Sequence, residues 1–171
     1  MSGYPRLLSV LAAASCLAMP AALAADGTWK FDTDSQDHPH LVYAENNKTI
    51  FSLGCGHAFV VRAVYPGAPK KDEAKATITI ANAKTRMKLA GEIEDGFTDE
   101  FPPNSTHIVQ WDLGFKRRDP ALYGKRWRKL EYRLFDFLDS GHPLTVSAEG
   151  RSYVLPAVNA ADWKQRFKKI C

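Results

Sequence analysis

Histidines and carboxylates gather in one polar stretch, residues 32–40, where they could bind a metal ion. His38 and His40 follow Asp34 and Asp37, with a proline between the two histidines. Imidazoles and carboxylates are common zinc ligands. The stretch shows no helix or strand pattern that would fix the geometry of the ligands. We therefore expect a solvated loop and predict no metal.

A cysteine and a histidine also stand close together at Cys55-Gly56-His57, a pair that could form a nucleophilic site. A catalytic cysteine reacts as its thiolate and needs a nearby base. No Gly-x-Ser-x-Gly elbow, phosphate loop, dinucleotide fingerprint or zinc-protease helix motif occurs in the chain. The sequence therefore predicts no catalytic residue and no cofactor. A site assembled in space from distant residues stays open.

Five carboxylates are concentrated between residues 92 and 100, and paired carboxylates can catalyse glycoside hydrolysis. Such a pair needs one member in an apolar pocket that raises its pKa. A dense acidic segment that ends in two prolines is more typical of a solvated loop. We therefore expect a loop from Glu92 to Asn104 whose carboxylates face water: Glu92, Glu94, Asp95, Asp99 and Glu100.

The most basic part of the chain runs from Lys116 to Lys129. It holds seven cations against one carboxylate, Asp119, with Tyr123 and Trp127 interleaved and Phe115 directly before it. Such a surface can attract an anionic polymer or a phospholipid headgroup, and its rings can stack on a sugar. The alternatives are a solubilising surface, or pairing with the acidic segment 92–100, where exposed ion pairs contribute little. The predicted ligand-binding residues are Lys116, Arg117, Arg118, Tyr123, Lys125, Arg126, Trp127 and Arg128.

Residues 1–24 have the pattern of an export signal. Arg6 precedes a short apolar run from Leu7 to Leu17, and small residues follow in Ala22-Leu23-Ala24. This three-part arrangement is typical of a cleaved signal peptide. The run is shorter than the about 20 apolar residues that span a bilayer. Lipidation at Cys16 is the weaker alternative, because the apolar run continues past that residue.

Cleavage of this signal leaves two cysteines, Cys55 and Cys171, in a periplasmic or secreted protein. Two cysteines in an oxidising compartment pair by default. A bridge across so long a loop contributes on the order of 4–5 kcal/mol in the chain-entropy model. A free reactive thiol beside His57 is the alternative. Residues 25–171 are the size of one domain with no transmembrane span, and a net charge of +4 for the full chain is too mild to indicate nucleic acid.

Alternating apolar and polar residues predict about eight short strands that would position these groups. The clearest runs from Ala76 to Ala81, where Ile78 and Ile80 face one way while Thr77 and Thr79 face the other. Turn signals stand between several of the strands, at Asn46-Asn47, Asn82-Ala83 and Glu149-Gly150.

Two segments have helical spacing instead. The first covers 127–138, carries charged residues on its other face and ends at Ser140-Gly141. The second is expected to begin at Asn159 and to place Trp163, Phe167 and Ile170 on one face. Antiparallel strands with two amphipathic helices, one of them C-terminal, predict an α+β fold built on an antiparallel sheet or a β-sandwich.

Six features follow one another along the chain: Trp29, the strand Thr49 to Cys55, Trp111, the helix ending at Asp139-Ser140-Gly141, a hairpin, and a last helix from Trp163 to Cys171. This layout resembles the small periplasmic accessory proteins associated with bacterial type VI secretion. The resemblance covers most of the chain after the signal. It implies a non-enzymatic, β-rich periplasmic domain with a bridge from Cys55 to Cys171.

These observations predict an exported, non-enzymatic binding or accessory module of the cell envelope. Its partner would be an envelope protein or an anionic envelope polymer, and not nucleic acid. Two alternatives stay open. One is a hydrolase of envelope material, and the other is an inhibitor that docks the loop Asp32 to His40 or Pro66 to Glu73 into an envelope-degrading enzyme.

Overall fold

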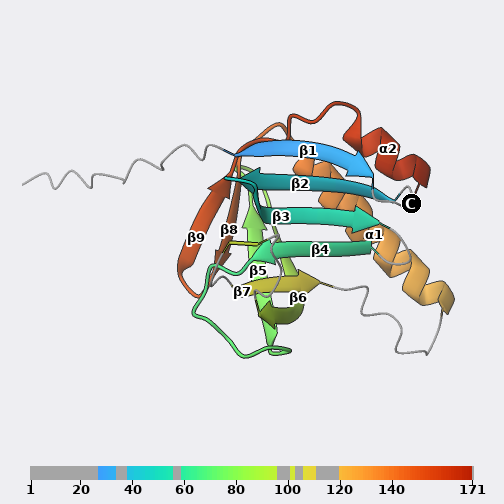
Figure 1. Cartoon of the computed structure of the whole chain (residues 1–171). Helices are drawn as coiled ribbons and strands as arrows, with labels where there is room; N and C mark the ends of the chain where they lie inside the picture. The colour runs from blue at the N-terminus through green and yellow to red at the C-terminus, as the bar shows by residue number, and fades with distance from the viewer. Residues whose placement is uncertain are drawn as a thin grey trace, which may run out of the picture.

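The computed structural model describes residues 27–33, 38–55, 59–95, 101–102, 106–110 and 120–170. This part of the chain forms nine strands and two helices (Figure 1). In chain order they are β1 (Thr28–Thr33), β2 (Pro39–Glu45), β3 (Lys48–Cys55), β4 (Phe59–Val64), β5 (Lys75–Ala81), β6 (Arg86–Asp95), β7 (Thr106–Gln110), α1 (Pro120–Leu138), β8 (Leu144–Ala148), β9 (Arg151–Leu155) and α2 (Trp163–Ile170).

The nine strands belong to one antiparallel sheet in the order β1-β2-β3-β4-β7-β6-β5-β8-β9. Strands β1 to β4 form a meander, β7 joins β4 and leads back through β6 to β5, and the β8–β9 hairpin is added to β5. The sheet curls into a half-barrel. Its two arms, β1 to β4 on one side and β5, β8 and β9 on the other, therefore run across each other in Figure 1. The predicted antiparallel α+β architecture is confirmed, with one curled sheet where a sandwich would have two.

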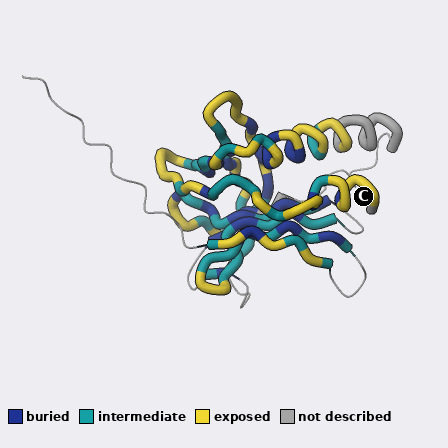
Figure 2. Tube along the Cα trace, turned by 90° about the horizontal axis from the view of Figure 1, so that it is seen from above, coloured by how far each residue is buried: buried dark blue, intermediate teal, exposed yellow. Residues whose placement is uncertain are grey.

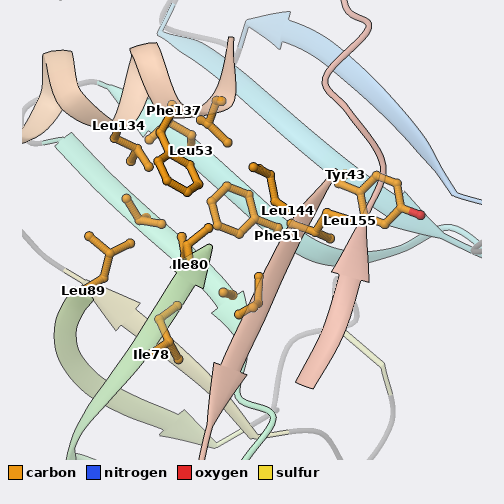
Figure 3. Close-up of a cluster of buried hydrophobic side chains, with 14 of the residues drawn as sticks. Tyr43, Phe51, Leu53, Ile78, Ile80, Leu89, Leu134, Phe137, Leu144 and Leu155 are labelled. Atoms are coloured by element: carbon orange, nitrogen blue, oxygen red, sulfur yellow. The ribbon is translucent and has the colours of Figure 1, made fainter. Parts of the chain in front are cut away.

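Alternation places one apolar set of side chains inside the curl. Ile78 and Ile80 are 1% and 0% exposed, whereas Thr77 on the other face of β5 is exposed. Residues from both arms of the sheet and from α1 meet in this core, as Figure 3 shows for Phe51, Leu144 and Leu134. The core therefore depends on pairings between segments that are distant in the sequence.

Two long-range hydrogen bonds join the arms beyond the strand pairing. The Trp29 indole Nε1 of β1 donates to the carbonyl of Pro156, which follows β9, over 2.9 Å. The Tyr153 hydroxyl of β9 donates to the carbonyl of Val64 at the end of β4 over 3.0 Å. The hairpin β8–β9 is thus attached to the β1–β4 meander as well as to β5.

The two helices cover one side of the curled sheet, and Figure 2 shows the outer side of α1 exposed. Proline at the first helical position suits the start of α1, because that position has no helical partner for an N–H. Gly141, with φ of 70°, follows its end and confirms the predicted stop. Neither described helix has the length and apolar character needed to cross a membrane.

Two segments that we expected to be loops are partly strands. Strand β1 continues to Thr33 and β2 starts at Pro39, which shortens the expected loop 32–40. Strand β6 continues to Asp95, so Glu92, Glu94 and Asp95 do not lie in a loop. In β6 the acidic residues are spaced two apart around buried Ile93, so they extend the alternation of the strand instead of ending it.

The last helix starts later than expected. Residues 156–160 have no regular structure, and α2 begins at Trp163 instead of at Asn159. Asp162 has a φ of 53°, which is not helical, and the Arg166 amide donates to its carbonyl over 3.0 Å. The predicted shared face is confirmed for Trp163 and Phe167, which are 3% and 0% exposed.

Candidate functional site

A pocket of about 740 Å³ lies between the β4–β5 loop and the start of the β5–β6 hairpin. Ala76 and Gly91 are register partners on the inward face of these two strands, and both are buried. The next inward pair, Ile78 and Leu89, fills the core, so the hollow opens where the inward side chains become small. The lining residues are Tyr65, Lys70, Lys75, Ala76, Thr77, Ala90, Gly91, Glu92 and Glu149.

The rim of the pocket is closed by an ion pair between the β4–β5 loop and the β8–β9 turn. Lys70 Nζ lies 2.6 Å from Glu149 Oε1. The other carboxylate oxygen of Glu149 accepts from the Ala68 amide over 3.1 Å, and the Tyr65 hydroxyl is bonded to the same carboxylate. The Glu149 side chain therefore binds three residues of the β4–β5 loop: Tyr65, Ala68 and Lys70.

The backbone at Glu149 is in a conformation that this residue type rarely adopts. Glu149 and Gly150 have φ of 50° and 76° in the two-residue turn between β8 and β9. A turn with both central φ positive favours Asn-Gly, so glutamate at the first position is unfavourable for the turn itself. Its contacts with the β4–β5 loop give a reason for glutamate at this position.

Gly67 lets the β4–β5 loop pack closely over the pocket wall. A Cβ atom at Gly67 would lie 2.5 Å from Cε1 of Tyr65 and 2.9 Å from Oε2 of Glu149. Both distances are shorter than a carbon atom tolerates, so a larger residue would push the loop off the ring. Lys70 Nζ also lies 5.8 Å from the centre of the Tyr65 ring, on the same side of the pocket.

The electrostatics of the rim favour the charged forms of Lys70 and Glu149 and the neutral form of Tyr65. The hydrogen bond with Lys70 lowers the pKa of Glu149, and the Ala68 amide acts in the same direction. The hydrogen bond with Glu149 raises the pKa of Lys70. Burial raises the pKa of Tyr65, and the bond with Glu149 adds to this. At neutral pH the rim therefore carries a formed ion pair and a neutral phenol.

A second polar group is buried on the other face of the sheet. His107 in β7 is 1% exposed, and its Nε2 lies 3.2 Å from Glu94 Oε2 in β6. The ring of Phe101 stacks on His107 with the ring centres 4.0 Å apart and the planes 2° from parallel. Nδ1 of His107 is buried and has no hydrogen-bond partner among the described residues.

Among the residues whose side chains the structure describes, the pocket lining includes none from α1, and so does not include Arg128. Arg128 is exposed on α1. The other predicted positions within α1 are Tyr123, Lys125, Arg126 and Trp127, whose side chains lie outside the described part of the structure. Lys116, Arg117 and Arg118 also lie outside the described residues.

Cys55 ends β3 and is disulfide-bonded. It is the one cysteine among the described residues, because Cys16 and Cys171 lie outside them. The pairing of Cys55 with Cys171 therefore stays a prediction. Helix α2, which ends one residue before Cys171, packs on β2, the neighbour of β3 in the sheet.

The metal hypothesis finds no support in the described residues, which hold no group of three potential ligands. His38 and His40 are described, whereas Asp34 and Asp37 are not. The ring of His40 packs beside Gly54 of β3, where a Cβ atom would lie 3.3 Å from Cε1 of His40.

The sequence did not predict the pocket, because most of its lining residues give no local signal of a binding site. Ala76 and Gly91 are small residues in ordinary strand patterns, and their pairing is a matter of register. The one local signal is Glu149 before Gly150, a residue poorly suited to a tight hairpin turn. Comparison of the chain with protein-family models, curated proteins and solved structures finds no significant match.

Proposed function

We propose that this protein is an exported, non-enzymatic binding module of the bacterial cell envelope, and that a small ligand binds in the pocket under the β4–β5 loop. The observation that carries the proposal is the hollow over Ala76 and Gly91. A small apolar floor with charged residues at the rim suits a ligand that has an apolar body and a polar end. The predicted export signal and the resemblance in layout to small type VI secretion accessory proteins support the envelope location.

The ionisation of the rim supports binding over hydrolysis. A hydrolase that uses two carboxyl groups needs one whose pKa is raised, so that it can donate a proton. The pKa of Glu149 is lowered instead, because the carboxylate is bonded to Lys70. Lys70 and Glu149 therefore hold their charges near neutral pH, which suits recognition of a polar ligand group better than proton transfer.

The test is to fill the hollow and measure binding of anilinonaphthalene sulfonate, a fluorescent probe with an apolar body and one anionic group. Ala76→Leu puts a larger side chain into the pocket, and we expect about tenfold weaker binding. Ala76→Val should give a smaller loss. Ala81→Leu is the matched control, because Ala81 lies on the other face of the same strand and outside the pocket.

Equal probe affinity in the wild type and in a folded Ala76→Leu variant contradicts the pocket proposal. Thermal unfolding of each variant establishes that it is folded. The envelope location has a separate test, in which cells are fractionated and the mass of the purified chain is measured. We expect a chain in the envelope fraction that starts at Ala25, and an uncleaved chain in the cytosol contradicts export.

A further inference from the structure

Helices α1 and α2 lie antiparallel and in contact. Lys164 at the start of α2 binds Asp136 over 3.0 Å and Asp139 over 2.8 Å at the end of α1. One turn further along α2, Lys168 Nζ lies 5.9 Å from the centre of the Tyr132 ring, one turn earlier in α1. Following α2 toward its end therefore leads back along α1 toward its basic first half.

The two ends of this helix pair differ in charge. At the end of α1, Asp136 and a neighbouring aspartate neutralise Lys164. At the Tyr132 end the exposed charged groups are cations, and they form no ion pair with another described residue. Glu131 is the carboxylate beside them; it is half-buried, and burial raises its pKa while Arg128 acts in the opposite direction. We define the cationic helix surface as Arg128, Lys129, Tyr132, Lys168 and Lys169.

This surface is spread over two helices and does not line the pocket. Tyr132 is 50% exposed at its centre and is one of two large apolar side chains that the described residues leave so exposed. A ring with a polar tip is the type of side chain that is enriched where a membrane meets water. In the sequence, the turn of α1 that precedes this surface also holds two cations and an aromatic residue: Lys125, Arg126 and Trp127.

We propose that the cationic helix surface binds the anionic surface of a phospholipid bilayer. Each Lys or Arg near such a surface strengthens binding about fivefold, and several act together across a plane. A soluble polyanion is recognised better by a groove, and the described lining of the pocket holds no residue from either helix. Binding at this surface rests on the proposed envelope location but does not use the pocket, so the two proposals can fail separately.

The experiment is co-sedimentation of protein purified from the envelope with vesicles made of phosphatidylglycerol and phosphatidylcholine. We expect the triple variant Arg128→Ser, Lys129→Ser, Lys168→Ser to bind about 100-fold more weakly than the wild type. The matched control removes the same charge from exposed residues of the β5–β6 hairpin and should bind nearly as the wild type does. Its changes are Lys84→Ser, Arg86→Ser and Lys88→Ser.

Further measurements test the contact with the bilayer, and binding of soluble polyphosphate distinguishes a soluble polyanion from an anionic bilayer as the ligand. Tyr132→Ser keeps the net charge and should weaken vesicle binding less than the triple variant does. Vesicles of pure phosphatidylcholine should not bind, and about 1 M salt should release the protein because it shortens the screening length to about 3 Å. Equal losses in the two triple variants, or binding of soluble polyphosphate without binding of anionic vesicles, overturns the proposal.

Discussion

Glu149 and Lys70 form an ion pair with 2.6 Å between Oε1 and Nζ, although one lies in the β8–β9 turn and the other in the β4–β5 loop. The pair joins the hairpin that closes the half-barrel to the loop that covers the pocket. Both side chains are partly exposed, so the pair contributes little to global stability. Its main effect is therefore on the position of the loop.

Glu149→Asn should free the β4–β5 loop without unfolding the protein. Asparagine suits the positive φ of the turn, so the hairpin itself should be favoured. The shorter neutral side chain loses the bonds to Lys70 and to the Ala68 amide. We expect faster hydrogen exchange at Ala68, with a melting temperature close to that of the wild type.

The control for this prediction is Lys71→Ser, which removes a neighbouring exposed charge that does not line the pocket. Exchange at Ala68 should stay at the wild-type rate in that variant. Unchanged exchange in Glu149→Asn would show that the loop is held by other contacts.

The ion pair should form over a wide range of pH. Because the pKa of Glu149 is lowered, its contribution is present above the ordinary value of 4.5 and is lost as pH falls through the lower folded value. Because the pKa of Lys70 is raised, its contribution is present below 10.5 and is lost only as pH rises through the higher folded value. The pair therefore should not respond to pH near neutrality.

Carbon-13 NMR of the Glu149 carboxyl group measures directly how this group titrates as the pH falls. We expect a titration midpoint below 4.5 in the wild type, moving up toward 4.5 in Lys70→Met. A wild-type midpoint at or above 4.5 would mean that the pair is not formed in solution.

His107 should contribute to stability mainly through the space that its ring fills. His107→Phe keeps a ring against Phe101 and removes a buried nitrogen that has no partner among the described residues. It also frees Glu94, which is partly exposed and can be hydrated. We expect a change within about 1 kcal/mol in urea unfolding.

His107→Ala is the comparison, and the cavity that it leaves should cost about 2–4 kcal/mol. If both substitutions cost the same, the contact with Glu94 contributes the stability and the ring volume does not.

The partner of Cys55 can be identified by mass spectrometry. We expect Cys171→Ser to leave a free thiol at Cys55 and to lower the free energy of unfolding by about 2–5 kcal/mol. Cys16→Ser should leave the bond intact, because residue 16 lies in the predicted signal. A bond at Cys55 that survives Cys171→Ser would show that the predicted pairing is wrong.

Local patterns were enough to predict much of this fold. The alternation in β5 predicted its buried face, and Asn46-Asn47 adopts the positive φ values of 48° and 59° expected of a hairpin turn. The periodicity of the first helix predicted which residues face the core, including buried Leu134. These features depend on neighbours in the chain, so the sequence contains them directly.

The extent of the acidic strand could not be judged in the same way. The number of carboxylates in this part of β6 is typical of a loop. However, Ile93 between them is 1% exposed and pairs with Ile108 of β7. Whether an acidic segment continues a strand depends on a partner strand that is present only in the folded sheet.

By itself, then, the sequence determined the alternation of the strands, the turn residues and the polar faces of the helices. Only the tertiary structure decided that Ala76 lies opposite Gly91 and that Glu149 reaches Lys70. The physical reason is that a pocket is bounded by residues from separate strands and loops, whose meeting depends on register and on the curl of the whole sheet. No short stretch of the chain carries that information.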